Sequence, residues 1–566
     1  MDRDASCPHA NRTWRNKIVD GVTAVANVLK MEGVDWIAVM PSNPLIEAAA
    51  IAGIRPVVCR QERTGVHMAD GFSRITNGKK IGIFLAQNGP GAENAFGGVA
   101  QAYADSVPIL VLPAGVARNR IGVEPNFHPV RAYESITKWA AHVNFADRVP
   151  ELMRQAFTKL RSGKPGPVLL EIPSDLSSDQ ISEEDFDYIP PVHMRVAADP
   201  AAVTRAARGF MSAQRPVIIA GQGVLYAEAT DELMELAELL QIPVMTTLEG
   251  KSAFPENHPL SLGVGGSSQT GPVHRFLTNA DVVFGAGVSF TKSSFTVPIP
   301  PGKTLIHLTN GDSDINKDYR TEYPILGDAK LALRQFIDEL KAQGVQQRSP
   351  NQELADEITA SREAWMAEWL PRLTSNEVPL NPYRVVWDIM HTVDLDNTIV
   401  THESGSPREQ VSPFWEARAP RSFIGWGKST QLGYSLGLAM GAKMAAPEKM
   451  VINFMGDAAF GMVGLDVETA VRANIPITTV VMNNSTMAIY PDSRIPTAVE
   501  RYGLKDLSGD FYQVAVALGA YAEQIHTPDE IKPAMQRAMQ ANADGRPALL
   551  EFITKEEGTF SKFRFD

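Results

Sequence analysis

The sequence predicts an α/β protein built from three consecutive domains, each with a doubly wound parallel sheet. Short apolar runs, typical of strands buried on both faces, alternate with amphipathic helical stretches along the chain. A loop at 177–191, closed by two prolines, and a polar stretch at 346–351 divide the sequence into three blocks. The length of 566 residues suits three ordinary domains with well-buried cores.

The first block, predicted to span 14–187, contains two apolar runs at Gly82–Ala86 and Ile109–Leu112, with a helical pattern at Ala92–Ala104 between them. A further run at Val168–Pro173 is expected to be its last strand. Such alternation of short strands and helices predicts a parallel sheet.

The second block, 195–345, is a smaller α/β unit, and the third, 378–555, has the size and class of the first without repeating its sequence. The tail at 556–566 has no strand or helix period, and we expect either a frayed end or a lid. The strands expected in the second and third blocks are Pro216–Ala220, Asp281–Phe284, Thr304–Leu308, Val451–Met455, Ile477–Met482 and Ala548–Ile553.

Composition restricts the partners and the compartment. The net charge is −12 and no long basic stripe is present, so a nucleic-acid partner is not expected. No apolar run reaches the roughly 18 residues that a membrane span needs, and Met1–Lys17 lacks the apolar core of a secretory signal. The only two cysteines, Cys7 and Cys59, favour a reducing cytoplasm over a disulfide framework.

The most informative pattern lies in the third block, where Gly456-Asp457 follows one strand and Asn483-Asn484 follows the next. The glycine permits a tight turn, and Ala458-Ala459 let the backbone approach an anion near the start of a helix, whose buried face we expect to continue to Val471. Because parallel strand ends share one edge of a sheet, Asp457 and Asn484 should lie together there. Two oxygen ligands plus phosphate oxygens suit Mg²⁺. Either motif alone would also suit an ordinary turn or loop.

Together these motifs resemble the signature of the thiamine-diphosphate-dependent superfamily that contains acetolactate synthase and pyruvate oxidase. The resemblance implies that Asp457, the Asn484 side chain and the Thr486 carbonyl hold Mg²⁺. The family usually has a glycine where this chain has Ala458 or Ala459. The full set expected to bind the cofactor is Glu62, Ser404, Gly405, Ser406, Thr430, Leu432, Gly456, Asp457, Ala458, Ala459, Asn484, Thr486, Met487 and Ala488.

Glu62 follows a short strand, Arg55–Cys59, and enters a helix. A carboxylate at a helix start is common and needs no function. However, the segment around it, and Gly78–Gly115 as well, resemble acetolactate synthase. The resemblance implies that Glu62 bonds the aminopyrimidine of the cofactor and so promotes loss of its reactive proton.

The segment Gly427–Ala442 resembles the family segment that bends the cofactor, with Leu432 between the two rings and the Thr430 carbonyl on the pyrimidine amine. Alone, it would pass for a glycine-rich core helix. The family joins the pyrimidine-binding first domain of one subunit to the diphosphate-binding third domain of another, which implies a homodimer or homotetramer.

The choice of reaction depends on weaker signals. The run Glu403–Ser406 is closer to 2-hydroxyacyl-CoA lyases and oxalyl-CoA decarboxylases than to acetolactate synthases, although it also suits a plain phosphate-contacting loop. The tail segment Phe560–Phe565 has two cations and three aromatics, as in segments that close over coenzyme A. We therefore expect a lyase or carboligase acting on a 2-hydroxyacyl-CoA.

Two alternatives remain: an acetolactate-synthase-like enzyme that uses a 2-oxo acid, and a non-catalytic regulatory or scaffold relative. The substrate pocket is expected to include Asn88, Phe127, His128 and Tyr490, with His128 as a proton shuttle unless it is structural. FAD or ADP in the central block is left open, because no motif decides it.

Overall fold

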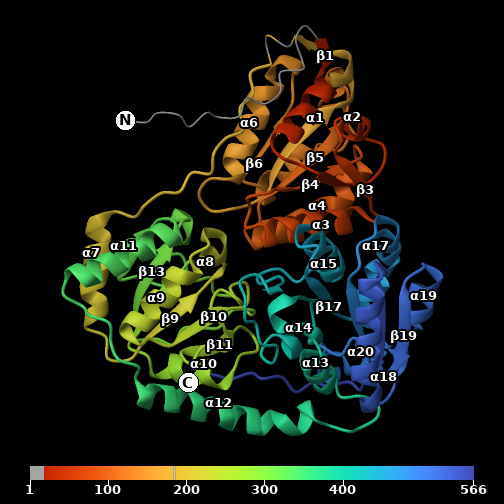
Figure 1. The fold of residues 1–566 in the computed structure, drawn as a ribbon. Coiled ribbons are helices and arrows are strands. Elements are labelled where there is room, and N and C mark those ends of the chain that lie inside the picture. The colour runs from red at the N-terminus through yellow and green to blue at the C-terminus, as the bar shows by residue number, and fades with distance from the viewer. Residues whose placement is uncertain (1–17, 183, 185, 566) are drawn as a thin grey trace.

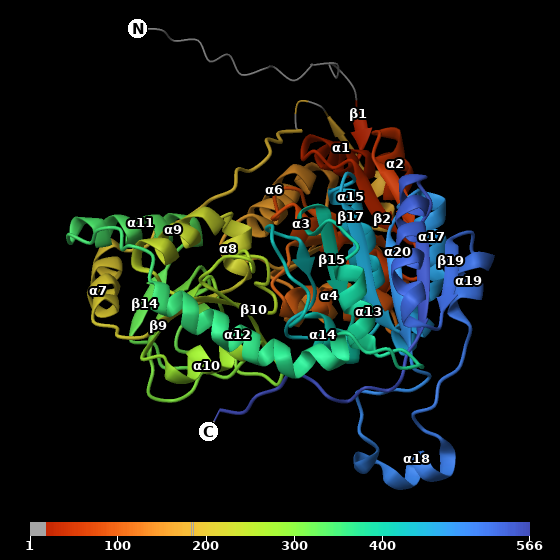
Figure 2. The ribbon, with the colours of Figure 1, turned by 60° about the horizontal axis from the view of Figure 1, so that its bottom comes forward.

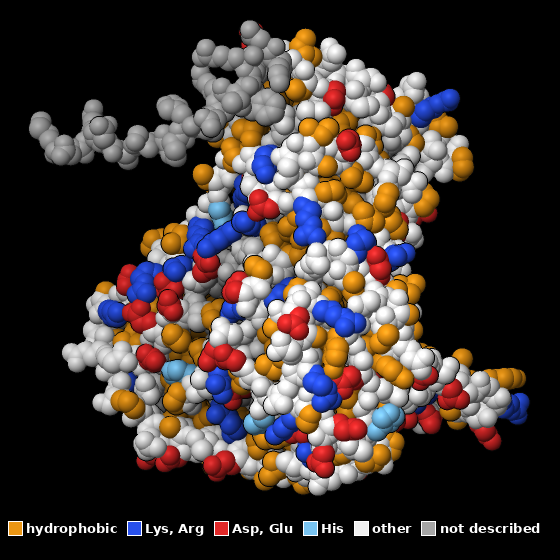
Figure 3. Space-filling model, turned by 45° about the vertical axis from the view of Figure 1, so that its right-hand side comes forward, with side chains coloured by type: hydrophobic (Ala, Val, Ile, Leu, Met, Phe, Trp, Pro, Cys, Tyr) orange, Lys and Arg blue, Asp and Glu red, His pale blue; other side chains and the backbone are white. Residues whose placement is uncertain are grey.

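A computed structural model describes residues 18–182, 184 and 186–565 and confirms an α/β protein with three parallel six-stranded sheets (Figure 1). Cys7, the segment Met1–Lys17 and the predicted domain start at 14–17 lie outside the described residues. Within them, no helix combines the length and apolarity needed to cross a bilayer. Acidic and basic side chains are interspersed over the face seen in Figure 3.

The first sheet has the order β3-β2-β4-β5-β7-β6, with all neighbours parallel. Its strands are β2 (Trp36–Val39), β3 (Arg55–Val58), β4 (Gly82–Ala86), β5 (Ile109–Gly115), β6 (Trp139–His142) and β7 (Val168–Pro173). Its helices are α1 (Gly21–Met31), α2 (Leu45–Ile51), α3 (Glu62–Ile75), α4 (Pro90–Ala104), α5 (Pro129–Tyr133) and α6 (Val149–Leu160).

The stretch at 177–191, which was expected to be a loop, contains a strand. β8 (Gln180–Ser182) pairs antiparallel with β1 (Ile18–Asp20), and the buried Ile181 anchors this pair to the core of the first domain. Only a contact between the two ends of the domain creates this pairing, so no local pattern announces it.

The central sheet has the order β11-β10-β9-β12-β13-β14. Its strands are β9 (Pro216–Ala220), β10 (Val244–Thr247), β11 (Ser261–Gly265), β12 (Val282–Ala286), β13 (Thr304–Thr309) and β14 (Tyr323–Leu326). The helices here are α7 (Pro200–Met211), α8 (Gln222–Ala227), α9 (Thr230–Leu240), α10 (Gly271–Asn279) and α11 (Ala329–Ala342). A longer helix, α12 (Gln352–Leu373), runs from this domain to the third one (Figure 1).

The third sheet has the order β16-β15-β17-β18-β20-β19. Its strands are β15 (Thr398–His402), β16 (Phe423–Ile424), β17 (Met450–Gly456), β18 (Thr478–Asn483), β19 (Tyr521–Ile525) and β20 (Ala548–Ile553). Its helices are α13 (Pro382–Met390), α14 (Ser406–Val411), α15 (Tyr434–Ala445), α16 (Asp457–Val463), α17 (Val467–Ala473), α18 (Pro496–Tyr502), α19 (Phe511–Ala517) and α20 (Pro528–Ala543). Figure 2 shows α18 standing away from the body of the molecule.

The single helix expected after Asp457 is two helices. α16 ends at Val463, a 3-10 turn covers Gly464–Asp466, and α17 begins at Val467. The turn presents the Asp466 carboxylate to the first domain, where it accepts from the backbone N–H of Arg60 at 2.7 Å. The apolar face nevertheless continues across the turn, because Val463, Val467 and Ala470 are buried in one core and Val471 packs against it.

The first and third domains of the chain pack through α3 and α15, which lie side by side in both ribbon views (Figures 1 and 2). Two glycines allow the close approach. A Cβ on Gly71 would lie 2.2 Å from the Leu438 carbonyl oxygen, and one on Gly441 would lie 2.0 Å from that of Met68. One hydrophobic core therefore continues through both domains.

The tail at 556–565 has no helix or strand, as the sequence predicts, but it is packed against the protein. It runs from the third domain back to the central one (Figure 1). The Ser561 hydroxyl donates to the Gln269 carbonyl at 2.6 Å and accepts from the Trp365 indole at 2.9 Å, and Phe563 stacks on His274.

Candidate active site

The carboxyl ends of β15, β17 and β18 form the floor of a cleft. Paired neighbours bring these ends together: His402 lies opposite Phe454 and Gly456 opposite Met482. The strand order reverses between β15 and β17, which is where open α/β sheets bind ligands. The cleft is lined by Ser404, Gly405, Ser406, Thr430, Leu432, Gly456, Asp457, Ala458, Ala459, Asn484, Thr486, Met487, Ala488 and Tyr490. It therefore gathers every predicted cofactor-binding residue of the third domain.

Asp457 is the buried carboxylate of this cleft, with 4% of its surface exposed. Its Oδ1 accepts from the Ala458 N–H at 2.9 Å, whereas its Oδ2 is buried with no partner among the described residues. Burial raises the pKa of Asp457 to about 6, against the lowering effect of nearby backbone N–H groups. A buried carboxylate oxygen without a donor suits a cation.

The loop after β18 places the amide of Asn484 in the same cleft. Its Oδ1 accepts from the Thr486 N–H at 3.1 Å, which fixes a tight turn through Ser485 at a φ of 56°. Asn483 has a structural role instead: its Nδ2 donates to Glu551 at 2.7 Å and its Oδ1 accepts from the Ser485 N–H. Among the described residues, no three His, Cys, Asp or Glu side chains form a metal-binding group, so a cation here needs amide, carbonyl and ligand oxygens.

The loop after β15 supplies small polar groups opposite Asp457. Gly405 has a φ of 81°, which side-chain-bearing residues rarely adopt. The Ser406 hydroxyl is buried and has no partner in the part of the chain described. The buried Glu403 holds the loop in place, because it accepts from the backbone N–H groups of Ser404 and Ser435. The donors present fit a diphosphate bound together with a divalent cation.

The segment that carries Thr430 and Leu432 is held by the first domain. The Asp105 carboxylate accepts from the N–H groups of Gly427 and Lys428 at 3.0–3.2 Å and is itself paired with the buried Arg74 at 3.0 Å. In this structure the Thr430 carbonyl accepts from the Ser404 hydroxyl at 3.3 Å.

The residues predicted in the first domain lie elsewhere in the single chain. Glu62 begins α3, is buried, and accepts from the Asn94 amide at 3.3 Å. Asn88 precedes α4, and His128 precedes Pro129 at the start of α5. None of Glu62, Asn88 and His128 lines the cleft formed by their own chain.

Several residues that line the cleft were not among the site residues predicted from the sequence. Arg408, Trp426, the central-domain residues Ser267 and Phe295, and Lys562 of the tail all line it. Arg408 lies only two positions after Ser406, so its proximity to the predicted phosphate loop was the available signal. Lys562 belongs to the tail that was expected to be a frayed end or a lid, whereas nothing in the sequence joins Phe295 to that loop.

A cleft with an unpaired buried carboxylate, a neighbouring amide and small hydroxyls at a switch point is typical of proteins that bind a phosphorylated cofactor. Family models agree with this class. The model described as the thiamine pyrophosphate enzyme N-terminal TPP binding domain matches residues 19–136, the central domain 203–336, and the C-terminal TPP binding domain 403–552.

Relatives match over nearly the whole chain. A probable acetolactate synthase large subunit of Methanocaldococcus jannaschii is 31% identical, over 94% of this chain and 91% of the relative. The acetolactate synthase isozyme 3 large subunit of Escherichia coli K12 is 28% identical over 94% and 95%. A glyoxylate carboligase of Escherichia coli O157:H7 is 29% identical over 94% and 92%.

The chain belongs to the thiamine pyrophosphate enzyme family, of the acetolactate synthase type. It is therefore an enzyme that depends on thiamine diphosphate, and the resemblance found in the sequence is confirmed. The alternative of a non-catalytic scaffold receives no support from these comparisons.

Proposed function

We propose that this enzyme is a carboligase that decarboxylates one 2-oxo acid and joins the remaining fragment to a second one, as an acetolactate synthase does. The observation that carries the proposal is the full-length similarity to acetolactate synthases and a glyoxylate carboligase. These relatives favour the 2-oxo acid reaction over the 2-hydroxyacyl-CoA lyase that the Glu403–Ser406 loop and the tail suggested.

The third domain would hold the diphosphate and Mg²⁺. Asp457 Oδ2, the Asn484 amide oxygen and the Thr486 carbonyl are the proposed metal ligands, and Ser404, Gly405 and Ser406 would bind the diphosphate. Support comes from the buried Asp457 and Ser406 oxygens that have no partner among the described residues. Leu432 and the Thr430 carbonyl would orient the two rings.

When bound, thiamine diphosphate supplies a carbon nucleophile that adds to a carbonyl and then stabilises the carbanion left by decarboxylation. The chain's own contribution is to bind, orient and dehydrate. Trp426 and Phe295, in edge contact at 5.3 Å, form an apolar wall of the cleft that excludes water from the reacting groups. Glu62 would hold a proton on the pyrimidine.

A second copy of the chain would supply Glu62 to each cleft. The support is that Glu62 does not line the cleft of its own chain, while its neighbour Arg60 is bonded to Asp466, which also lies outside that cleft. We therefore propose a homodimer or homotetramer with shared sites, in which Asn88 and His128 accompany Glu62 into the partner's cleft.

Mixing two inactive variants tests this arrangement. If Glu62→Gln and Asp457→Asn chains are unfolded together and reassembled, half of the dimers are mixed, and one of the two sites in each is intact. Activity of about a quarter of the wild-type value is then expected. Glu62 and Asp457 serving a site from the same chain would give no recovery.

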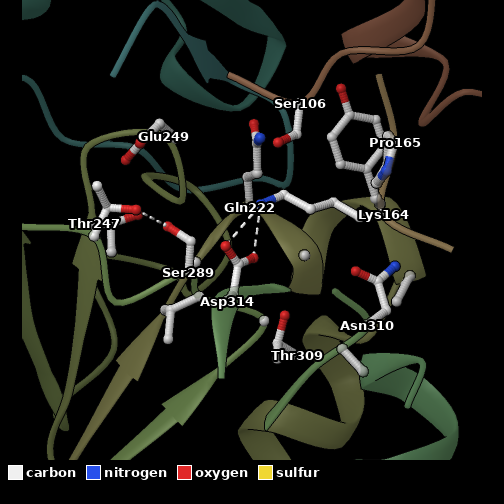
Figure 4. Close-up of a pocket in the computed structure, with 18 of the residues that line it drawn as sticks. Ser106, Lys164, Pro165, Gln222, Thr247, Glu249, Ser289, Thr309, Asn310 and Asp314 are labelled. Atoms are coloured by element: carbon white, nitrogen blue, oxygen red, sulfur yellow. Dashed lines mark hydrogen bonds and ion pairs between the residues drawn. The ribbon is translucent and has the colours of Figure 1, made fainter. Parts of the chain in front are cut away.

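The central domain would bind FAD or ADP. A cavity lies where the three domains meet, and the pair of Lys164 Nζ and Asp314 Oδ2, 2.7 Å apart, faces it (Figure 4). It opens beside Gly221 and Gly223, between β9 and β12, where the strand order reverses. Phe295 lines both this cavity and the cleft. Heat-released nucleotide, identified by mass spectrometry, tests the assignment.

Product analysis decides between the two substrate classes. The holoenzyme is incubated with pyruvate, with glyoxylate, or with a 2-hydroxyacyl-CoA, and the products are followed by mass spectrometry. Acetolactate or a tartronate semialdehyde product is expected from the 2-oxo acids. Thioester cleavage without any product from either 2-oxo acid would overturn the proposal and restore the lyase.

A further inference from the structure

The end of the cleft that faces the central domain contains a buried cation. Arg408, in the first turn of α14, is 5% exposed. Its guanidinium lies over the Trp426 ring at 4.5 Å and over the Phe295 ring at 5.1 Å. Such aromatic contacts hold the planar group in one orientation at the cleft.

The hydrogen bonds of Arg408 are incomplete. Nη2 donates to its neighbour Glu409, but Nε and Nη1 are buried without an acceptor in the part of the chain described. Burying a charged donor unpaired is costly, so two unpaired N–H groups that line a ligand cleft indicate an acceptor supplied by the ligand.

Glu409 cannot supply the missing acceptors, because its oxygens are already engaged. It accepts from the Ser267 hydroxyl at 2.9 and 3.1 Å and from the hydroxyl of Ser268. The Lys562 ammonium lies 3.8 Å from its Oε1. Both serines come from the central domain and Lys562 from the tail, so three parts of the chain fix this carboxylate.

The charges at this end of the cleft do not cancel. Burial lowers the pKa of Arg408 to about 9, which leaves it protonated at neutral pH. Two cations, Arg408 and Lys562, face one anion, Glu409, so one positive charge remains. That excess matches a single carboxylate, whereas the phosphates of a coenzyme A carry several negative charges.

We propose that Arg408 binds the carboxylate of the 2-oxo acid substrate through its unpaired Nη1, as a specificity-determining residue. A charged N–H group that donates to a carboxylate oxygen makes a shorter and stronger hydrogen bond than a neutral pair does, and the guanidinium stays charged at neutral pH. The ring faces of Trp426 and Phe295 strengthen the contact, since they keep water away from it. This assignment rests on the proposed function, because it takes a 2-oxo acid as the substrate.

The test measures binding of oxamate, an unreactive isostere of pyruvate, to the thiamine diphosphate–Mg²⁺ holoenzyme by calorimetry. Arg408→Gln is expected to weaken oxamate roughly 30-fold or more and to raise KM for a 2-oxo acid more than it lowers kcat. Arg408→Lys keeps the charge but loses the planar group that the Trp426 and Phe295 rings hold in place, so an intermediate loss is expected.

The matched control is Arg418→Gln, which removes an arginine that also pairs with a nearby glutamate, Glu416, but lies outside the cleft. It should leave the affinity for oxamate unchanged. Cofactor affinity and melting temperature show which Arg408 variant is folded. An oxamate dissociation constant equal to wild type, in whichever variant still binds cofactor, would overturn the inference.

The same measurements separate this inference from the proposed function. A wild-type enzyme that makes no product from any 2-oxo acid, yet binds oxamate in an Arg408-dependent way, would refute the function and keep the carboxylate site. An active enzyme whose oxamate affinity ignores Arg408 would refute the site and keep the function.

Discussion

The first and third sheets of this enzyme arrange their strands in the same order, with β2 and β4 in the positions that β15 and β17 occupy. The backbone hydrogen bond made by the residue directly after β2 or β15 is also equivalent in the two sheets. Met40 N–H donates to the Leu85 carbonyl, and Glu403 N–H to the Phe454 carbonyl. Both sheets therefore have a switch point at which the chain diverges to either side.

The two switch points are filled differently. In the first sheet the buried Asn43 donates from Nδ2 to the carbonyls of Ala86 and Leu112, at 3.1 and 3.2 Å. In the third sheet small residues line an open cleft, and Asp457 keeps an oxygen with no partner among the described residues. Topology provides a crevice in both sheets, and the side chains decide whether it is used for stability or for binding.

The largest effect is expected from Glu62→Gln. This variant tests whether the first domain contributes to the rate of catalysis and not to the affinity for the cofactor. Removing a proton-holding carboxylate should lower kcat roughly 10²- to 10⁴-fold while the affinity for thiamine diphosphate changes only a few-fold. Steady-state kinetics and cofactor titration measure the two separately. A loss confined to cofactor affinity would contradict the assigned role.

Asp457→Asn tests the expectation that the third sheet mainly provides affinity for the cofactor. The amide keeps the shape but loses the charge, so affinity for thiamine diphosphate with Mg²⁺ should fall roughly 100-fold or more. Titration calorimetry measures it, and Asp492→Asn, at an exposed aspartate outside the cleft, is the control. Equal affinity in the two variants would exclude Asp457 as a ligand.

Asn43→Leu should show that the first crevice serves stability. The two carbonyls would be left buried without a donor, which costs about 2–4 kcal/mol in the free energy of unfolding. Urea unfolding measures the change, with Asn279→Ala as the control, because Asn279 donates to a backbone carbonyl at the exposed surface. That control should stay within about 0.5 kcal/mol of wild type.

The smallest effect is a shared sensitivity to acid. Burial lowers the pKa of His67, on α3, and of His402, at the end of β15, to about 3. Because these folded-state pKa values lie below the ordinary one, the unfolded chain takes up protons first. Stability is therefore full above about pH 6.5 and falls by about 1 kcal/mol per histidine between pH 6.5 and 5.5.

Replacing either histidine with glutamine should make this pH dependence less steep. The stability of each variant at pH 8 is the reference with which its stability at lower pH is compared. Melting temperatures from pH 8 to 5 measure the slope.

Local pattern determined much of this protein. The Gly456-Asp457 and Asn483-Asn484 motifs each follow a strand, and parallel strands must end at a common edge, so the sequence alone brought these residues together. The strand-then-helix pattern also predicted that Glu62 enters a helix, and α3 begins there. It could not predict the break at Gly464, since that turn is stabilised by the first domain through Arg60 and Asp466.

Only the tertiary structure decided which distant groups meet. Phe295 reaches Arg408 from another domain, and Lys562 reaches Glu409 from the tail. Asn43 closes one of two crevices that share a topology. The physical reason is that strand and helix periods report each residue's immediate chain neighbours. The burial and pairing of a charge depend on surfaces that packing brings together from more than a hundred residues away along the chain.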